Sequence, residues 1–354
     1  MKKLLLSTVA VTALAIAAPA IADESGVKLE VGGGASVYGV WVDSENNNAR
    51  DFDMLRHTEV HFSGETTLDN GLTVGAHIET DADNGGGFAI DESYLYMQGS
   101  WGRVNLGAED GAAFLLQVAA PSADSNVDGV RQEIGPFVNA NLQNLDYDQD
   151  VSGKSDKFTY LTPVFSGFQA GVSYTTALEN SRSQGTTLDN TTDEIGDIFD
   201  LAARYEGQMD QVGLTVGAGY THGSAEQVGA EDRKVWNAGI DLDIGAFGLG
   251  VAYMDDNGPT SSSNPEGTNN DDVTTWVLGA DYTTGPFTLG ASYMNQDNEV
   301  GTDTDTDRYT GGVVYSYGPG MSFRGSVSYA DFDSTTNTAD TDETAVLLGT
   351  QVDF

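Results

Sequence analysis

Apolar residues recur at every second position along most of the chain. In residues 72–79, Leu, Val, Ala and Ile occupy one parity and Thr, Gly, His and Glu occupy the other. Successive side chains of a β-strand point to opposite faces, so this period of two predicts strands with two unlike faces. The same alternation recurs in residues 168–174, 214–220 and 287–293. The predicted fold class is therefore all-β.

Sixteen such segments can be counted, and an even number suits a closed antiparallel barrel. The first and fourth alternate poorly, so a count higher or lower by two stays open. Past the N-terminal segment, no apolar run approaches the roughly 20 residues of a membrane-spanning helix. The expected strands begin near Lys28, Arg56, Leu72, Ile90, Arg103, Lys157, Phe168, Phe199, Val212, Lys234, Phe247, Thr274, Phe287, Arg308, Met321 and Thr344.

Short and long connections alternate between these segments. The short set has turn residues, at 69–71, 100–102, 244–246, 285–286 and 318–320. The long set is polar and acidic, at about 44–54, 175–198, 222–232, 254–272, 294–307 and 330–343. Tight turns at one rim and long loops at the other are typical of a transmembrane barrel with short periplasmic turns and long extracellular loops.

Aromatic residues gather where the strands end, as expected at the two interfaces of a bilayer. They share the apolar parity of their strands, so both groups should face outward. A soluble sandwich or lectin also alternates its faces, but it tolerates varied loop lengths at both ends. The two groups are Tyr174, Tyr220, Tyr253, Tyr293 and Tyr329 before long loops, and Phe168, Phe247, Phe287 and Phe323 at the opposite ends.

The first 22 residues have the pattern of a cleaved signal peptide. Lys2 and Lys3 precede an apolar stretch that ends in an Ala-Ile-Ala cleavage site, so the mature chain should begin at Asp23. The alternative, a membrane anchor, would need a longer stretch and a basic flank after it. The same alternating pattern continues to the end of the chain with no linker, which predicts a single barrel domain over residues 23–354.

Charge and cysteine content exclude several kinds of function. The chain has 15 Lys+Arg against 54 Asp+Glu, and loss of two leader lysines leaves a net charge of about -41. Such a chain repels nucleic acid, and we expect cations rather than phosphates as partners. With no cysteine, disulfide scaffolds and thiol chemistry are excluded. No cofactor is required by any motif.

Three motifs and the chain end carry a family resemblance. The last strand places Val352 and the terminal Phe354 on its apolar face. The motifs are FSG at 62–64 with LDNGL at 68–72, GRVNLG at 102–107, and YLTPVFSGF at 160–168. Together they resemble the general diffusion porins of Gram-negative bacteria.

That resemblance implies an outer-membrane homotrimer of sixteen-stranded barrels that passes ions and small hydrophilic solutes. It implies contact with outer-membrane lipids and lipopolysaccharide, and a role for Phe354 as the signal read by the barrel assembly machinery. It also implies that the loop after the fifth strand folds inward opposite a basic wall. Residues 107–156 are that loop here, although a solvated external loop stays the alternative.

The candidate pore residues follow from this loop and from lumen parity. Acids in a narrow aqueous passage would concentrate cations. The second strand departs from the family by placing histidines and an acid where related proteins place arginines, so we expect cation preference. Candidate loop acids are Glu109, Asp110, Asp124, Asp128 and Glu133. Only some of these five can face the pore, and an exposed acid on the loop surface is the alternative for each. Candidate wall residues are Arg103, Arg204, Arg308, Arg324, His57, Glu59, His61, His77 and Glu79.

Two groups could hold metal ions. Across the hairpin centred on Asn70, His61 should pair near Glu79 with His77 diagonal to it, as a metal or pH-sensitive cluster or as polar wall residues in water. Alternating aspartates suggest Ca²⁺ sites in acidic loops, although neither run has the EF-hand pattern and bare loop acids are the alternative. These runs are Asp146, Asp148 and Asp150, and Asp303, Asp305 and Asp307.

Other functions remain as alternatives. A substrate-specific channel would line its lumen with an aromatic slide or an arginine track, and neither stands out. A barrel lipase would need a Ser-His-acid group on its outer face, whereas His57, His61 and His77 point inward by parity, so no enzyme is expected. A non-conducting surface barrel or adhesin would need a plugged or narrow lumen.

Overall fold

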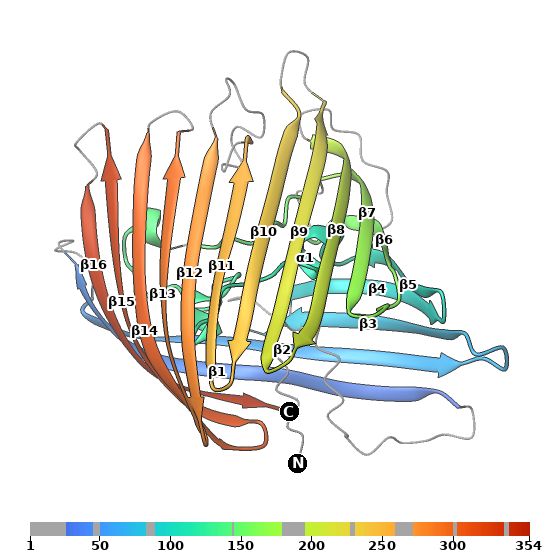
Figure 1. Ribbon diagram of the computed structural model, residues 1–354, viewed down its shortest axis with the longest axis horizontal. Helices are drawn as coiled ribbons and strands as arrows, with labels where there is room; N and C mark the ends of the chain where they lie inside the picture. Colours follow the sequence, from blue (N-terminus) through green and yellow to red (C-terminus); the bar gives the residue numbers. More distant parts are fainter. Residues whose placement is uncertain are drawn as a thin grey trace.

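The computed structural model describes residues 26–44, 50–82, 89–143, 145–178, 195–226, 231–258, 272–299, 303–335 and 340–354. The expected leader, residues 1–22, lies outside them. Each strand pairs antiparallel with the strands before and after it, and β1 pairs with β16 to close a barrel (Figure 1). Closure leaves no unpaired edge, which is what a sheet exposed to lipid requires.

Sixteen strands form the barrel, so the predicted fold class and strand number are confirmed. They are β1 (Lys28–Ser44), β2 (Phe52–Thr67), β3 (Thr73–Asp81), β4 (Ala89–Gly99), β5 (Gly102–Ala108), β6 (Asp156–Leu161), β7 (Phe168–Ala177), β8 (Ile195–Met209), β9 (Val212–Ala225), β10 (Arg233–Ile244), β11 (Phe247–Asp256), β12 (Val273–Thr284), β13 (Phe287–Asn298), β14 (Thr304–Gly318), β15 (Met321–Ser334) and β16 (Thr341–Asp353).

Three strands begin earlier than the hydrophobic pattern predicts. β2, β8 and β14 start at Phe52, Ile195 and Thr304, several residues before the first clearly alternating position. Their backbone pairing continues into the polar rim, as between Trp41 and Phe52. Ladder hydrogen bonds hold these ends after the alternation of side chains has been lost.

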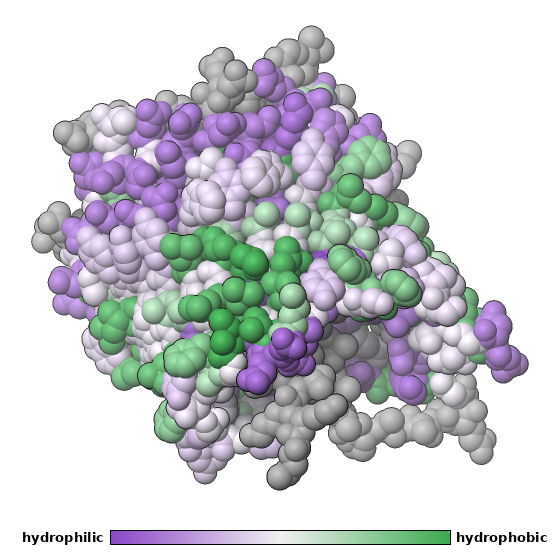
Figure 2. All heavy atoms as spheres, viewed as in Figure 1, coloured by the Kyte–Doolittle hydropathy of each residue, from purple (hydrophilic) through white to green (hydrophobic). Residues whose placement is uncertain are grey.

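The two faces of the wall differ as the alternation predicts. On β12, Trp276 and Leu278 are about half exposed at 49% and 50%, whereas Val277 between them is 1% exposed. Figure 2 shows hydrophobic side chains in a band across the outer face, below a hydrophilic rim. This band is the surface that lipid would cover.

Aromatic rings form two girdles on the outer face, which confirms the predicted belts. Neighbouring rings in each girdle lie with centroids 4.4–4.9 Å apart. The pairs on the side of the long loops are Trp236–Tyr253, Tyr253–Trp276 and Tyr293–Tyr309. Those on the side of the tight turns are Phe168–Tyr205, Phe247–Tyr282 and Phe287–Tyr315.

The last residue takes part in barrel closure. Phe354 accepts a hydrogen bond from the backbone N–H of Gly33 (2.9 Å) and donates one to its carbonyl (3.0 Å). Val346, Leu348 and Val352 are exposed on the same face of β16 as Phe354. The terminal ring therefore lies on the outer face, at the apolar parity that the sequence predicts.

The long loop between β5 and β6, residues 109–155, lies inside the barrel, so its predicted inward fold is confirmed (Figure 1). It contains α1 (Ala112–Leu115), α2 (Ser125–Asp128) and the 3₁₀ turn η1 (Ala140–Leu142). In the described part of the chain, no helix is long and apolar enough to cross a membrane. The alternative of an external loop is excluded by these positions.

Wall glycines let the loop backbone approach the barrel closely. A Cβ atom on Gly239 of β10 would clash with the carbonyl oxygen of Val118, and one on Gly279 of β12 would clash with that of Pro121. Backbone atoms cannot move aside as the end of a flexible side chain can. These glycines therefore seat the loop against β10 and β12.

The variant Gly239→Ala tests this seating. Its methyl group would push the loop off the wall, so we expect the free energy of unfolding in urea to fall by about 1–3 kcal/mol. Gly311→Ala on β14 is the matched control, because its Cβ would meet nothing closer than 3.9 Å. Equal stability of the two variants would contradict the tight seating of the loop.

Candidate functional site

Asp124 fixes the loop to the barrel near its seam. Its carboxylate accepts hydrogen bonds from Arg324 Nη1 of β15 at 2.6 Å and from the Tyr38 hydroxyl of β1 at 2.9 Å. The Asp124 side chain has no exposed surface. A buried carboxylate is tolerated only with a cation and hydrogen bonds of this kind. One acid thus ties the loop to two strands.

Two further anchors hold the loop against β13 and β16. Asp128 Oδ2 accepts a hydrogen bond from Ser292 Oγ at 2.6 Å. Glu343 of β16 is 0% exposed, and its carboxylate accepts the backbone N–H groups of Val138 (2.6 Å) and Asn139 (3.2 Å). A loop carboxylate, Asp128, is therefore bound by the wall, and a wall carboxylate, Glu343, is bound by the loop.

The loop's own two cations pair with three of its six remaining acids. Arg131 donates to Asp148 at 2.9 Å and to Asp150 at 2.8 Å, and it lies 3.5 Å from Asp110. Lys154 Nζ lies 2.7 Å from Asp110 and 2.5 Å from Glu92 of β4. The interior of the loop is thus an ion-pair network rather than a free acidic surface.

This network bears on the predicted calcium site at Asp146, Asp148 and Asp150. The guanidinium of Arg131 occupies the carboxylates of Asp148 and Asp150, and Asp146 accepts the backbone N–H of Gln132 at 2.5 Å. Calcium there stays a prediction that this geometry does not favour. At the second aspartate run, Asp307 accepts the Tyr293 hydroxyl at 2.7 Å.

The wall of β2 and β3 faces the lumen with histidines and acids. His61 lies directly opposite Glu79 in the strand register, as predicted from the hairpin. His57 Nε2 lies 3.3 Å from Glu59 Oε1 and 3.3 Å from Glu133 Oε2 of the loop. All these side chains are partly exposed. The loop therefore meets the β2 wall at Glu133, and we call this contact the narrowing because a loop inside the barrel reduces its cross-section there.

Burial changes the proton affinity of the loop acids. It raises the pKa of Glu133 and of Glu109 to about 7, and that of Asp128 to about 6. Burial alone would lower the pKa of Lys154, but the carboxylates of Asp110 and Glu92 raise it above its ordinary value. The charge of Glu133 at the narrowing therefore changes near neutral pH.

Of the five predicted loop acids, Glu133 alone is presented to the lumen. Only some of the five were expected to face the pore, and the other four are corrected as candidates, because their carboxylates are 1–5% exposed and serve as anchors or ion-pair partners. Glu109 accepts both hydrogen bonds of the Asn105 amide at 2.6 Å. The buried four are Glu109, Asp110, Asp124 and Asp128.

The four predicted wall arginines have different roles. The prediction that Arg308 lines the pore is corrected. Its side chain points inward from β14, but the loop covers it, and it donates a hydrogen bond to the Leu145 carbonyl at 3.0 Å. Arg324 is bound by Asp124, and Arg204 lies 3.4 Å from Glu206. The guanidinium of Arg103 lies over the Tyr96 ring, 4.2 Å from its centre. Of the basic wall, Arg308 is therefore covered and Arg324 is neutralised, whereas Arg103 and Arg204 remain partly exposed.

Sequence reasoning did not identify the residues that fix the loop from outside it. Tyr38 and Glu343 lie far from the loop in sequence, and Glu92 lies on β4, 62 positions from the Lys154 that it pairs with. Local periodicity carries no signal for such contacts. Arg131 and Lys154 could have been found, since they are the only two cations among the many acids of residues 107–156. Lone cations in an acidic segment are expected to form ion pairs.

The comparisons with known proteins agree with this architecture. Residues 7–335 match the family described as Gram-negative porin. Among curated proteins no match was found.

Solved structures with a similar fold include two porins and one further outer-membrane protein. The anion-selective porin of Comamonas acidovorans is 17% identical in sequence with a TM-score of 0.67, and the match covers 93% of this chain and 100% of that one. The outer-membrane protein OmpT of Vibrio cholerae, in its trimer form, is 12% identical with a TM-score of 0.63, over 93% and 100%. A mutant of the Rh. blastica porin is 18% identical with a TM-score of 0.61, over 92% and 100%.

The variant Arg131→Gln tests the ion-pair network. It leaves the partly buried carboxylates of Asp148 and Asp150 without their cation, so we expect the free energy of unfolding to fall by about 2 kcal/mol. Lys28→Gln is the control, because Lys28 is 69% exposed and its pair with Glu65 (3.6 Å) should contribute less than about 1 kcal/mol. Urea titrations monitored by tryptophan fluorescence would measure both, and similar losses would contradict the network's role.

Proposed function

The chain belongs to the Gram-negative porin family, and on that premise we propose that its diffusion channel prefers cations. Porins are not enzymes: they are water-filled barrels of the outer membrane through which small hydrophilic solutes diffuse passively. The ion preference of such a channel depends on the charges at its narrowing. An acidic narrowing therefore favours cations over anions.

The observation that carries the proposal is the excess of carboxylates where the loop meets β2. The wall and the loop place four carboxylates against three imidazoles, so while Glu133 is charged the acids remain in excess even if every imidazole is protonated. A narrow aqueous passage between low-dielectric walls focuses such a field and concentrates cations. The groups are Glu59, Glu79, Asp81 and Glu133, against His57, His61 and His77.

Two of the four wall arginines supply little opposing charge. Arg308 is covered by the loop, and Arg324 is paired with Asp124 at 2.6 Å. Farther toward the turns, the lumen parity of β10 and β12 carries Asp241 and Asp281, which are partly exposed, and Asp243, which is exposed. An ion that passes the narrowing therefore continues along an acidic wall.

The porin of Comamonas acidovorans is described as anion-selective. At 17% identity the likeness concerns the fold, and the lumen charges must be read from this chain. Here the β2 wall presents His57, Glu59 and His61. Opposite selectivities on one barrel are expected, because lumen side chains can change without altering the apolar outer face.

Reversal potentials in planar bilayers under a KCl gradient test the preference. We expect the native channel to favour K⁺ over Cl⁻, and Glu133→Gln to lower that ratio by up to about fivefold, since a unit charge acts with about 1 kcal/mol across 4 Å of water. Glu206→Gln at the turn rim, 57% exposed, is the control and should change the ratio less. Anion preference in the native channel would overturn the proposal.

The preference should also depend on pH. Burial raises the pKa of Glu133 to about 7, so this carboxylate is charged above pH 7 and loses its charge as the pH falls through that value. The K⁺ to Cl⁻ permeability ratio should therefore decline between about pH 8 and pH 5.5. In the same pH series, the Glu133→Gln channel should lack the change in permeability ratio near pH 7. An unchanged decline in this variant would mean that other groups cause it and would contradict this account.

The proposal includes a homotrimer. The Vibrio cholerae relative is described in a trimer form. Here β5 and β6 have seven and six residues, and at about 3.4 Å per residue and a tilt near 45° they rise only about 15 Å, less than an apolar band of about 25 Å. We therefore expect a neighbouring subunit, rather than lipid, to cover the barrel wall at β5 and β6.

Export and assembly complete the proposal. Residues 1–22 are removed as a signal peptide, which leaves a barrel domain from Asp23 to Phe354. The outward ring of Phe354 supports its role as the signal for the barrel assembly machinery. The aromatic girdles support contact with lipids and lipopolysaccharide at the two interfaces.

A further inference from the structure

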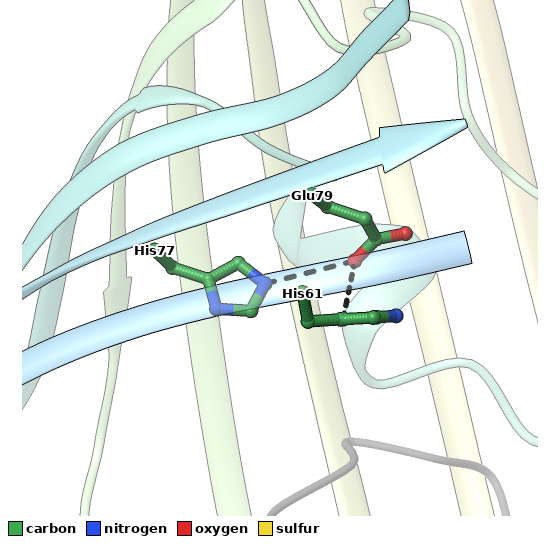
Figure 3. A group of neighbouring side chains, drawn as sticks. All are labelled: His61, His77 and Glu79. Carbon is green, nitrogen blue, oxygen red and sulfur yellow. Dashed lines mark ion pairs between the residues drawn. The ribbon is translucent and has the colours of Figure 1, made fainter. Parts of the chain in front are cut away.

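Two imidazoles and one carboxylate converge on the lumen wall where β2 pairs with β3. Figure 3 shows both rings directed toward Glu79. His61 Nδ1 lies 3.1 Å and His77 Nε2 lies 3.6 Å from the same oxygen, Glu79 Oε2. One ligand atom from each residue lies within 4.8 Å of the other two. Passive diffusion of ions and solutes does not require this arrangement.

The distances suit a small divalent metal ion. Zinc–ligand bonds of about 2.0–2.1 Å in a tetrahedron place neighbouring ligand atoms roughly 3.3 Å apart. The two measured distances, 3.1 and 3.6 Å, lie on either side of that value. Small side-chain rotations would therefore bring the three atoms onto one ion.

A hydrogen bond already orients one of the rings. His77 Nδ1 lies 2.8 Å from Ser63 Oγ, and these two residues are directly opposite in the strand register. Because Nδ1 is engaged in this hydrogen bond, the other ring nitrogen, Nε2, is directed toward Glu79. The Tyr94 ring packs against the same imidazole with centroids 5.2 Å apart. Metal-bound histidines are ordinarily held in this way through their second nitrogen.

We propose that His61, His77 and Glu79 form a binding site for a divalent transition metal such as Zn²⁺ on the lumen wall. Imidazole and carboxylate together suit zinc, copper and nickel, whereas calcium and magnesium prefer oxygen ligands. The three side chains are partly exposed, so the remaining coordination positions face lumen water. Three protein ligands with an open fourth position is a known zinc arrangement.

A second group on the same wall is the competing location. His57, Glu59 and Glu133 also bring ligand atoms within 4.8 Å of one another. That group has one imidazole, and Glu133 comes from the loop rather than from a strand. The His61 group has two imidazoles on adjacent paired strands, so its geometry is held by the barrel itself.

A bound ion would oppose the passage of cations, because it adds two positive charges beside the narrowing. This consequence for the current rests on the proposed function, whereas metal binding itself does not. Lys154 of the inward loop is held by Asp110 and Glu92, which limits its repulsion of an incoming ion. Zinc should therefore reduce the K⁺ current through the native channel.

Isothermal titration calorimetry of the refolded full-length barrel in detergent tests the site, with ZnCl₂ as the probe and MgCl₂ as the comparison ion. We expect one zinc per chain and no comparable magnesium binding. His77→Gln should weaken zinc binding at least about tenfold, and Ser63→Ala about tenfold through loss of ring orientation. His222→Gln, which removes a histidine paired with Asp232 near the loop rim, is the matched control and should bind as the native chain does.

Several results would overturn the site. Native zinc binding by His77→Gln would do so, as would loss of binding in His57→Gln with binding retained in His77→Gln. Circular dichroism and metal-free conductance of each variant establish that the barrel has folded. A barrel that binds zinc as predicted but carries no current would contradict the proposed function and leave the metal site standing.

Discussion

The buried carboxylate of Asp124 is the contact on which the arrangement inside the barrel depends. It has no exposed surface, and it is held by Arg324 at 2.6 Å and by the Tyr38 hydroxyl at 2.9 Å. Such a charge is stable in the interior only while its cation and hydrogen bonds remain in place. The loop can therefore occupy the lumen in one position, and departure from it would leave Asp124 and Arg324 without each other.

This constraint determines which charges reach the passage. Asp124 and Asp128 are used as anchors, and Asp148 and Asp150 share an ion pair with Arg131, so the loop presents Glu133 at the narrowing. The acidic character of the passage thus comes mainly from the β2 and β3 wall. Selectivity and loop position are carried by different residues, although both depend on carboxylates.

The barrel could be predicted from the sequence because its rules are local. Period-two alternation, tight turns and aromatic ends each act over a few residues, and the hairpin around Asn70 was enough to place His61 opposite Glu79. The parity of Arg308 was also correct, since it does point inward. That it is covered could not be foreseen, because the loop residue it meets, Leu145, is 163 positions away.

The contacts that build the site are long-range and carry no periodic signal. Asp128 and Ser292 are 164 residues apart, and Asp124 and Arg324 are 200 apart. Their pairing follows from where the loop lies after the barrel has closed. The sequence therefore predicted which residues were candidates, whereas the folded lumen decided which of them line the passage and which are buried as anchors.

The position of the loop is the central claim, and the natural absence of cysteine makes it directly measurable. Asp128→Cys combined with Ser292→Cys, treated with a short bifunctional thiol reagent, should cross-link within each chain, because the native side chains touch at 2.6 Å. Protease digestion and mass spectrometry would detect the joined peptides. Two free thiols that label separately and never cross-link would contradict the inward, anchored loop.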